Sequence, residues 1–326
     1  MTTSEPVVAI DLGGTKALAG VVEANGTVRS RVWLASRDLK GHPDELLDRL
    51  AKGASEAATQ ADLPFESIDA IGLCVPGPLD RSRSIVAMAP NLGWTNLPIR
   101  EELQRRLRGK SVFLENDVRA AALGEHRLGA GRGYTSMLAV FIGSGVGGGM
   151  VVDGELFHGA HGGAGELGHM VVRAGGPRCG CGRAGCLEAM AARDAVGRYV
   201  IADVKRGHKT QLTEILNGDL LAFTSRDLAI AVAEHDAVAI RAARRSARYT
   251  GLAIGSLVNL LDPGIIVIGG GIAEALGQAY VDWAAEIARR QILSSAKDLP
   301  IVPSQLRDDA GLLGAALTAF SGRNGG

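Results

Sequence analysis

The sequence predicts an α/β protein built from two related halves. Apolar runs of strand length alternate with segments of helical periodicity, and each half opens with two strands joined by a tight turn. The chain has 326 residues, which is enough for two domains with substantial cores. We expect residues 1–117 and a final helix at about 307–322 to form a small domain, and residues 118–306 to form a large one.

The first half begins with a buried strand over Val7–Asp11 that ends in a glycine turn. Ala17–Val22 and Thr27–Trp33 follow as paired strands, because Asn25-Gly26 suits the tight turn of a hairpin. The pattern then predicts a helix over Pro43–Gln60, a strand over Ile68–Val75, a helix over Ile99–Leu107, a strand over Ser111–Glu115 and a helix over Val118–Leu128.

The second half repeats a strand, a glycine turn and a strand, here Met137–Ile142 and Gly149–Val152, before a loop-rich stretch over 155–186. Helices and buried strands then alternate to the end of the chain. Helices are predicted over Leu187–Val204, Ser225–Glu234, about Ala237–Leu260, about Ala279–Leu293 and Gly311–Phe320, and strands over Ile265–Ile268 and Ile301–Leu306.

Composition and charge exclude several classes of function. Hydrophobic residues make up 46% and charged ones 21%, as in soluble globular proteins, and Lys plus Arg equal Asp plus Glu at 35 each. No overall field therefore favours nucleic acid or a membrane surface. The polar stretch Met1–Glu5 leaves no room for a secretory signal, and no apolar run approaches the roughly 20 residues that cross a bilayer. We expect a cytoplasmic protein.

Two glycine-rich turns could each hold phosphate groups. The first is Asp11-Leu12-Gly13-Gly14-Thr15-Lys16, and the second spans Gly143–Gly149 and includes Ser144. Glycine lets backbone N–H groups approach an anion, Thr15 and Lys16 add a hydroxyl and a cation, and Asp11 could hold a magnesium ion through water. Either turn alone could be a plain connection between strands. One turn in each half favours a nucleotide clamped between two related domains.

Three of the four cysteines, Cys179, Cys181 and Cys186, lie within eight residues, and His169 precedes them. Three sulfurs and one imidazole are a ligand set suited to a closed tetrahedral zinc site, which would be structural because no position is left for water. Unligated loop cysteines are the alternative. Cys74 stands alone in an apolar run and suits a small core position.

Polar side chains that could bind a sugar surround these motifs. Glu115-Asn116-Asp117 ends a strand, where α/β folds place functional side chains. A kinase that acts on a hydroxyl needs a carboxylate to accept the proton, and Asp117 fits that role, although an N-cap for the following helix is an equal alternative. Other groups could grip vicinal hydroxyls, although each alone is more often a solvated loop residue: Asn91, Glu166, His169 and Glu188.

The pattern resembles the ROK family of sugar kinases and repressors over nearly the whole chain. The most specific part is Ala164–His169 followed by Cys179–Glu188. Ser144 replaces a threonine common in the family, and Val118-Arg119 stand where Ala-Asn is frequent. The other matching motifs are Asp11–Lys16, Val75–Pro78, Pro90–Trp94, Glu115–Asp117, Ala120–Glu125, Gly143–Gly149, Leu261–Pro263 and Ile268–Gly271.

The resemblance implies an actin-like ATPase (ribonuclease H-like) fold with two α/β domains around a cleft, in homodimers or dimers of dimers. It implies ATP-dependent phosphorylation of the primary 6-hydroxyl of a hexose, with Mg²⁺, a structural Zn²⁺ on His169, Cys179, Cys181 and Cys186, and Asp117 as general base. His169 would also reach the sugar. The implied sugar contacts are Gly77, Asn91, Asn116, Asp117, Glu166, His169 and Glu188, and the implied ATP contacts are Asp11, Gly13, Gly14, Thr15, Lys16, Gly143, Ser144, Gly145, Gly147, Gly270 and Gly271.

Glucose is the favoured acceptor in this reading. Kinases of N-acetylmannosamine or N-acetylglucosamine are the main alternative, followed by kinases of fructose, mannose or allose, and polyphosphate could replace ATP as donor. Repressors of the family carry a helix-turn-helix before the first glycine turn, whereas here six residues precede Val7. A sugar-sensing regulator is therefore disfavoured. A non-catalytic sugar-binding module is disfavoured because Asp117 and both glycine turns are present.

Overall fold

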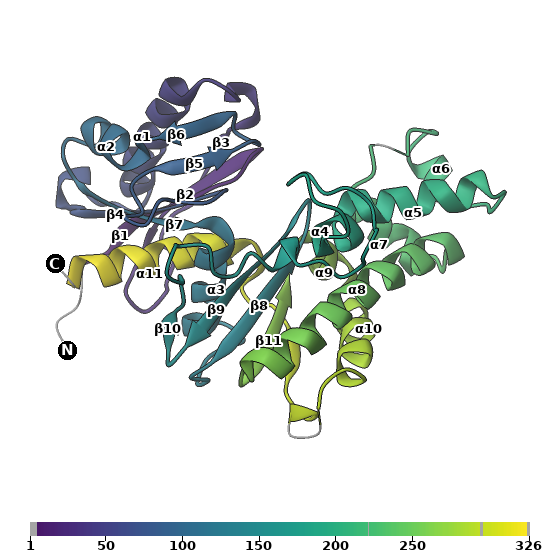
Figure 1. Ribbon diagram of the computed structural model, residues 1–326. Coiled ribbons are helices and arrows are strands. Elements are labelled where there is room, and N and C mark those ends of the chain that lie inside the picture. Colours follow the sequence, from purple (N-terminus) through teal and green to yellow (C-terminus); the bar gives the residue numbers. More distant parts are fainter. Residues whose placement is uncertain (1–4, 221, 294–295, 325–326) are drawn as a thin grey trace.

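The computed structural model describes residues 5–220, 222–293 and 296–324, and it contains two mixed five-stranded sheets flanked by helices (Figure 1). Residues 1–4 of the polar N-terminal stretch lie outside the described residues. The first sheet has the order β3-β2-β1-β4-β7 and the second β10-β9-β8-β11-β12. In each sheet, the first three strands in the sequence pair antiparallel and the fourth pairs in parallel with the first, so the two halves repeat one topology.

The first sheet is buried on both faces. Alternate residues of β1 point to opposite layers: Val8 and Ile10 join a core with α1 and α2, and Val7 and Ala9 join a core with α11. This is why the parallel strands read as continuous apolar runs. The elements are β1 (Val7–Leu12), β2 (Lys16–Val22), β3 (Val32–Ala35), α1 (Pro43–Gln60), β4 (Ala70–Val75), the hairpin β5 (Val86–Ala89) and β6 (Trp94–Leu97), α2 (Ile99–Arg106), β7 (Ser111–Asn116), α3 (Asp117–Leu128) and α11 (Ala310–Asn324).

The second sheet packs one face on a layer of helices and the other on α3. Leu138 and Val140 of β8 join the helical core, whereas Met137 and Ala139 contact the cluster that contains Ala122 of α3. The elements are β8 (Met137–Ile142), β9 (Val146–Val152), β10 (Glu155–Leu156), α4 (Leu187–Ala191), α5 (Arg193–Lys205), α6 (Leu212–Ile215), α7 (Ser225–Ala233), α8 (Ala237–Leu261), β11 (Ile265–Gly269), α9 (Gly271–Leu276), α10 (Gln278–Arg289) and β12 (Ile301–Pro303).

Helix α3 packs against both α11, which covers the first sheet, and β9, a strand of the second sheet (Figure 1). One helix therefore connects the two halves. The helix begins at Asp117, directly after β7. The division into two domains near residue 118 stays a prediction. Within the described residues, no helix is both long and apolar enough to cross a bilayer.

The predicted order of elements is confirmed, and α1 has the predicted bounds. The predicted strand Thr27–Trp33 is wrong in its bounds, because β3 begins at Val32. The predicted helix Leu187–Val204 is two helices, since Ala192 has the extended backbone angles φ −63° and ψ 166°. The strand predicted over Ile301–Leu306 ends at Pro303. The hairpin β5–β6, the short strand β10 and the helices α6 and α9 were not predicted.

The second glycine turn is shorter than predicted. Strand β9 begins at Val146, so the turn proper is formed by Gly143, Ser144 and Gly145, and the three glycines that follow belong to the strand. A Cβ atom on Gly147 would lie 2.8 Å from a Val118 methyl group. Gly148 and Gly149 are packed as closely, against Leu167 and Ala122. These strand glycines therefore permit close packing of β9 against α3 and the loop before the cysteine cluster.

The crossing of α3 and α11 depends on small residues. A Cβ atom on Gly314 of α11 would overlap the backbone carbonyl oxygen of Ala120 in α3. We expect Gly314→Ala to lower the free energy of unfolding by about 1–3 kcal/mol, because the helices must move apart. Urea denaturation measures this change. Gly163→Ala is the control, since a Cβ there meets nothing within 4 Å, and equal stability of the two variants would contradict the packing argument.

Candidate active site

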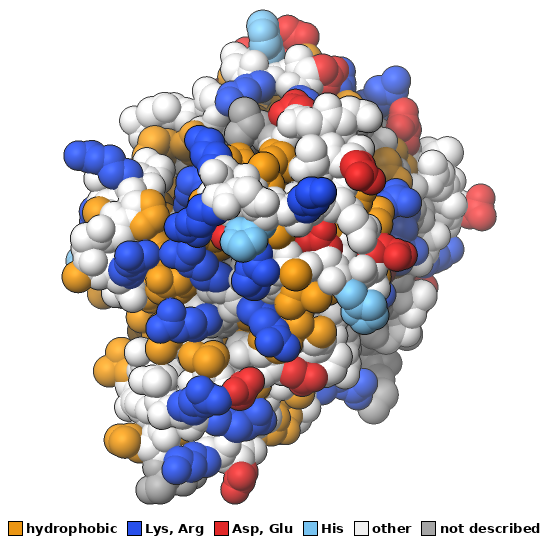
Figure 2. All heavy atoms as spheres, turned by 90° about the vertical axis from the view of Figure 1, so that its right-hand side faces the viewer, with side chains coloured by type: hydrophobic (Ala, Val, Ile, Leu, Met, Phe, Trp, Pro, Cys, Tyr) orange, Lys and Arg blue, Asp and Glu red, His pale blue; other side chains and the backbone are white. Residues whose placement is uncertain are grey.

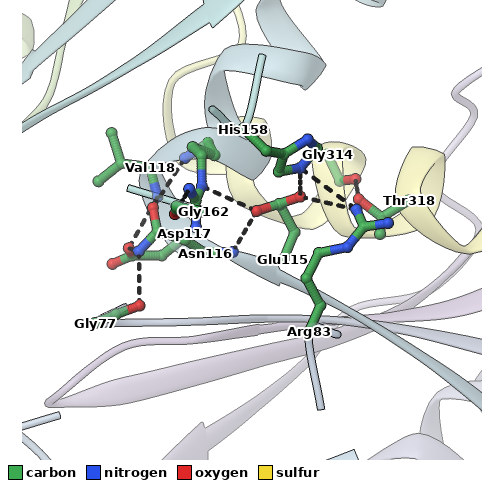
Figure 3. Close-up of polar contacts among 11 residues, drawn as sticks. Gly77, Arg83, Glu115, Asn116, Asp117, Val118, His158, Gly162, Gly314 and Thr318 are labelled. Atoms are coloured by element: carbon green, nitrogen blue, oxygen red, sulfur yellow. Dashed lines mark hydrogen bonds and ion pairs between the residues drawn. The ribbon is translucent and has the colours of Figure 1, made fainter. Parts of the chain in front are cut away.

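The carboxyl ends of β1, β4 and β7 bring together three predicted site segments. These strands are parallel, with Asp11 in register with Cys74 and Val75 in register with Asn116. Asp11, Gly77 and Asp117 therefore lie at one edge of the first sheet. The side chain of Asn116 joins two of them, because its Nδ2 donates to the Gly77 carbonyl at 3.2 Å and to Asp117 Oδ1 at 2.9 Å (Figure 3).

Asp117 is half-buried at the first position of α3. Burial raises the pKa of its carboxyl to about 6; the backbone N–H of Val118 opposes this shift and the negative charge of Asp11 adds to it. The helix cap is Asn116, whose side chain accepts from the N–H groups of Val118 and Arg119, so the alternative of Asp117 as N-cap is wrong. Asp117 is a carboxylate poised to exchange a proton near neutral pH.

Asp11 faces a small cavity beside the first glycine turn. The cavity has a volume of about 110 Å³ and is lined by Asp11, Gly13, Lys16, Leu18, Trp33 and Asp308. Burial raises the pKa of Asp11, although the Cys74 thiol donates to its Oδ1 at 3.1 Å. Lys16, predicted to face phosphate, has its Nζ 4.0 Å above the Trp33 ring. The carboxylates of Asp11 and Asp308, beside a glycine turn, offer oxygen ligands of the kind that Mg²⁺ binds.

The second glycine turn lies at the corresponding edge of the second sheet. Strands β8 and β11 are parallel, with Phe141 opposite Gly269, so Gly143 and the pair Gly270-Gly271 follow neighbouring strands. Gly270 has φ +85°, and a Cβ atom there would lie 2.6 Å from the backbone nitrogen of Ile142. Only glycine fits this position without displacing β8. The geometry brings the predicted nucleotide residues of the second half together.

The four predicted metal ligands converge. The ligand atoms of His169, Cys179, Cys181 and Cys186 all lie within 4.8 Å of one another. Cys181 Sγ and Cys186 Sγ are 3.7 Å apart, and His169 Nδ1 lies 3.7 Å from Cys179 Sγ. Two sulfurs bound tetrahedrally at about 2.3 Å from one zinc would be about 3.8 Å apart, so the residues fit the ion. Hydrogen bonds from Arg183 lower the pKa of Cys181 to about 6, which favours the thiolate.

Glu188 connects this cluster to the second glycine turn. Its Oε1 accepts from the Cys179 thiol at 3.4 Å, and its Oε2 accepts from the backbone N–H of Val146 at 3.1 Å. His169 turns Nδ1 toward the sulfurs, which leaves the other ring nitrogen for a different partner. Of the other predicted sugar contacts, Glu166 is exposed, and Asn91 is exposed with its Cβ against Gly14. Their contacts with a sugar stay predictions.

A buried ionic network beside Asp117 was not predicted. Glu115 is 1% exposed, and its carboxylate contacts three cationic or imidazole groups: Arg119 Nε at 3.0 Å, His158 Nε2 at 2.7 Å and Arg83 Nη1 at 3.3 Å (Figure 3). Burial opposes ionisation, but the hydrogen bond from His158 and the charge of Arg119 hold the pKa of Glu115 below its usual value. The network fastens the segments that carry Arg83 and His158 to β7, the strand directly before Asp117.

No short-range signal identified this network. Arg83 lies in the polar loop run Asp80–Ser84 and His158 in a glycine-rich loop, and Glu115 belongs to the motif Glu115–Asp117 without a predicted role of its own. Asp308, which shares the cavity with Asp11, likewise lies in an unremarkable Arg-Asp-Asp run before the last helix. These residues meet only through packing of distant segments.

Comparison with known proteins agrees with this geometry. The family model described as "ROK family" matches residues 7–321. A glucokinase of Thermotoga maritima is 34% identical over 313 residues, which is 95% of this chain and 96% of that protein.

Two solved structures are similar over almost their full length. A ROK hexokinase of Thermus thermophilus has 38% identity and a TM-score of 0.81, with 99% of this chain and 100% of that chain covered. A ROK family glucokinase of Streptomyces griseus in complex with glucose and AMPPNP has 30% identity and a TM-score of 0.86, with 97% and 100% covered. The predicted actin-like α/β fold is thereby confirmed, and the chain belongs to the ROK family.

Proposed function

We propose that this protein transfers the terminal phosphoryl group of ATP to the primary 6-hydroxyl of a hexose, with glucose as the preferred acceptor. The observation that carries the proposal is the Asp117 carboxylate, half-buried with a pKa raised to about 6, at the strand edge that also holds Asp11 and Gly77. The similarity to proteins named glucokinase supports glucose and ATP as substrates.

Asp117 would act as general base. At neutral pH a carboxyl with this pKa is largely ionised, yet it is more basic than a free aspartate, so it can accept the proton of the attacking hydroxyl. Asn116 would hold the carboxylate in place through its hydrogen bond to Oδ1, while the same side chain caps α3. The orientation of the Asp117 carboxylate is therefore set by Asn116, which is both the last residue of β7 and the N-cap of α3.

The remaining predicted residues would bind the two substrates. Mg²⁺ carried with the nucleotide would neutralise charge on the phosphates, and Asp11 and Asp308 are the carboxylates that could hold it. The sugar would bind through Asn91, Glu166, His169 and Glu188, with Asn116 and Gly77 beside Asp117. A structural zinc on His169 and the three cysteines would order the loop that carries Glu166 and His169. Closure of the two halves would exclude water, a competing acceptor.

A substrate panel tests the function. Initial rates with glucose, mannose, fructose, allose, N-acetylglucosamine and N-acetylmannosamine, each with ATP and with polyphosphate, give kcat/KM for every pair. We expect the highest value for glucose with ATP. A higher kcat/KM for an N-acetylated sugar would make that sugar the preferred acceptor in place of glucose. Absence of turnover with every pair would favour a sugar-sensing regulator.

The pH dependence of turnover follows from the raised pKa of Asp117. Only the ionised base accepts a proton, so kcat/KM is expected to rise with pH and to level off above about 6. Below that value it should fall about tenfold for each pH unit. A pH–rate profile between pH 4.5 and 8 measures this, with the protein's folding checked by circular dichroism at each pH. A profile without an inflection near 6 would contradict the role of Asp117.

The predicted homodimer and cytoplasmic location are part of the same proposal. Clustered cysteines that would bind zinc as thiolates suit a reducing compartment. Sedimentation velocity of the purified protein measures the oligomeric state directly.

A further inference from the structure

A cleft on the helical side of the molecule is lined almost entirely by arginine. It has a volume of about 680 Å³, and its lining residues are Arg173, Arg241, Arg244, Arg245, Arg248 and Tyr249. Figure 2 shows this side, on which Lys and Arg side chains gather with few acidic side chains among them. The volume is within the range of about 300–1,000 Å³ typical of small-molecule sites. None of these residues takes part in the kinase site described above.

The arginines come from one face of a helix and from one loop. Arg241, Arg244, Arg245 and Arg248 are spaced i, i+3, i+4 and i+7 on α8, and all four are exposed, whereas the residues between them are buried. Like charges at this spacing repel one another, at a cost of a few tenths of a kcal/mol per pair. Arg173, on the loop between His169 and the cysteine cluster, adds a fifth positive charge. The arrangement therefore concentrates positive charge on one face of α8 although the repulsion destabilises the helix.

Local contacts hold the guanidinium groups without neutralising most of them. Arg241 pairs with Asp203 at 2.8 Å. The other three of α8 lie over aromatic rings: Arg244 at 5.2 Å from the Trp283 ring centre, Arg245 at 4.1 Å from Tyr199 and Arg248 at 5.8 Å from Tyr249. A guanidinium stacked on a ring keeps its N–H groups free to donate at the edge. These side chains are therefore positioned in advance for an anion.

We propose that this cleft binds a small polyanion that carries two or more phosphate groups. Several planar guanidinium forks facing one cavity match the oxygens of neighbouring phosphates, and each can donate two parallel hydrogen bonds. The aromatic rings beneath them reduce the entropy lost on binding, since the arginines are already held. Its lining residues include none of those predicted to contact ATP or the sugar, so we expect its ligand to bind together with the kinase substrates.

Calorimetric titration of the whole protein with tripolyphosphate tests this proposal. Saturating glucose and a non-hydrolysable ATP analogue are included, so that the nucleotide cleft is already filled. We expect saturable binding that weakens with added salt. Arg244→Gln/Arg245→Gln should reduce the affinity roughly tenfold or more, because two charge-assisted contacts are lost. Arg248→Gln provides a second variant if the double variant folds poorly.

The controls separate a built site from general attraction. Arg105→Gln removes one positive charge, as Arg248→Gln does, but from the exposed surface of α2 in the other half, and it should leave the affinity unchanged. Orthophosphate should bind more weakly than tripolyphosphate, and citrate distinguishes a phosphate preference from a carboxylate one.

Three results would overturn the proposal: no binding with the nucleotide cleft filled, equal loss in the Arg105 variant, or citrate binding as tightly as tripolyphosphate. Sedimentation adds a fourth. If the wild type forms an oligomer and the double variant is a monomer, this face is an interface between copies of the chain instead.

Discussion

Asp117→Asn is expected to lower kcat for glucose by about 10²–10⁴-fold while leaving the affinity for glucose close to that of the wild type. Asparagine has the same shape, and its amide oxygen can still accept from the backbone N–H of Val118, as Asp117 Oδ1 does at 2.9 Å. It cannot take a proton from the sugar. A coupled assay for ADP gives kcat, and calorimetry gives the glucose affinity.

The same substitution should not weaken nucleotide binding. Asp117 and Asp11 repel each other, since the charge of Asp11 contributes to the raised pKa of Asp117. A neutral side chain removes this repulsion and one negative charge near the site proposed for the phosphates. Asp69→Asn, an exposed aspartate at the far end of the first sheet, is the matched control and should keep full activity. Turnover of Asp117→Asn within a few-fold of the wild type would remove Asp117 from the role of base.

What the sequence predicted well has a short-range origin. The strand before the first turn, the helix over Pro43–Gln60 and the cluster of one histidine and three cysteines are encoded by periodicity or by residues close in the chain. The parallel strand ends that gather Asp11 and Asp117 follow from the alternation of strands and helices. The grouping of these two carboxylates at one edge of the sheet was therefore predictable from the sequence.

The errors have a physical pattern. Glycine gives the same signal in a turn and in a strand that packs closely, so Gly147 and Gly148 were predicted as turn although they lie in β9. The break at Ala192 has no glycine or proline to mark it. The Glu115 network joins residues up to 75 positions apart, so its members could be paired only after the segments were packed. The type of a residue therefore predicted its contacts where its partners were near in sequence. It did not predict them where the partners were far apart in the chain.

Replacing Cys181 with serine is expected to remove zinc and to destabilise the sugar side of the site. A serine hydroxyl stays protonated at neutral pH, whereas the Cys181 thiol has its pKa lowered to about 6 and is already largely a thiolate. Because metal binding is linked to folding, the loop between His169 and Cys186 should lose order and the melting temperature should fall. Metal analysis and calorimetry of unfolding measure both effects. Cys74→Ala, outside the cluster, should keep its zinc.

Loss of zinc in Cys181→Ser should weaken glucose binding more than it slows the chemical step. Glu188 places Oε1 3.4 Å from Cys179 Sγ and accepts from the Val146 N–H at Oε2. His169 shares its loop with Glu166, so losing the metal is expected to loosen three predicted sugar contacts at once. Asp117 is held by Asn116 and the start of α3 instead. KM for glucose should therefore rise markedly in Cys181→Ser, while kcat at saturating glucose changes less. Full zinc content in this variant would refute the ligand set, and an unchanged KM with zinc lost would separate the metal from the sugar pocket.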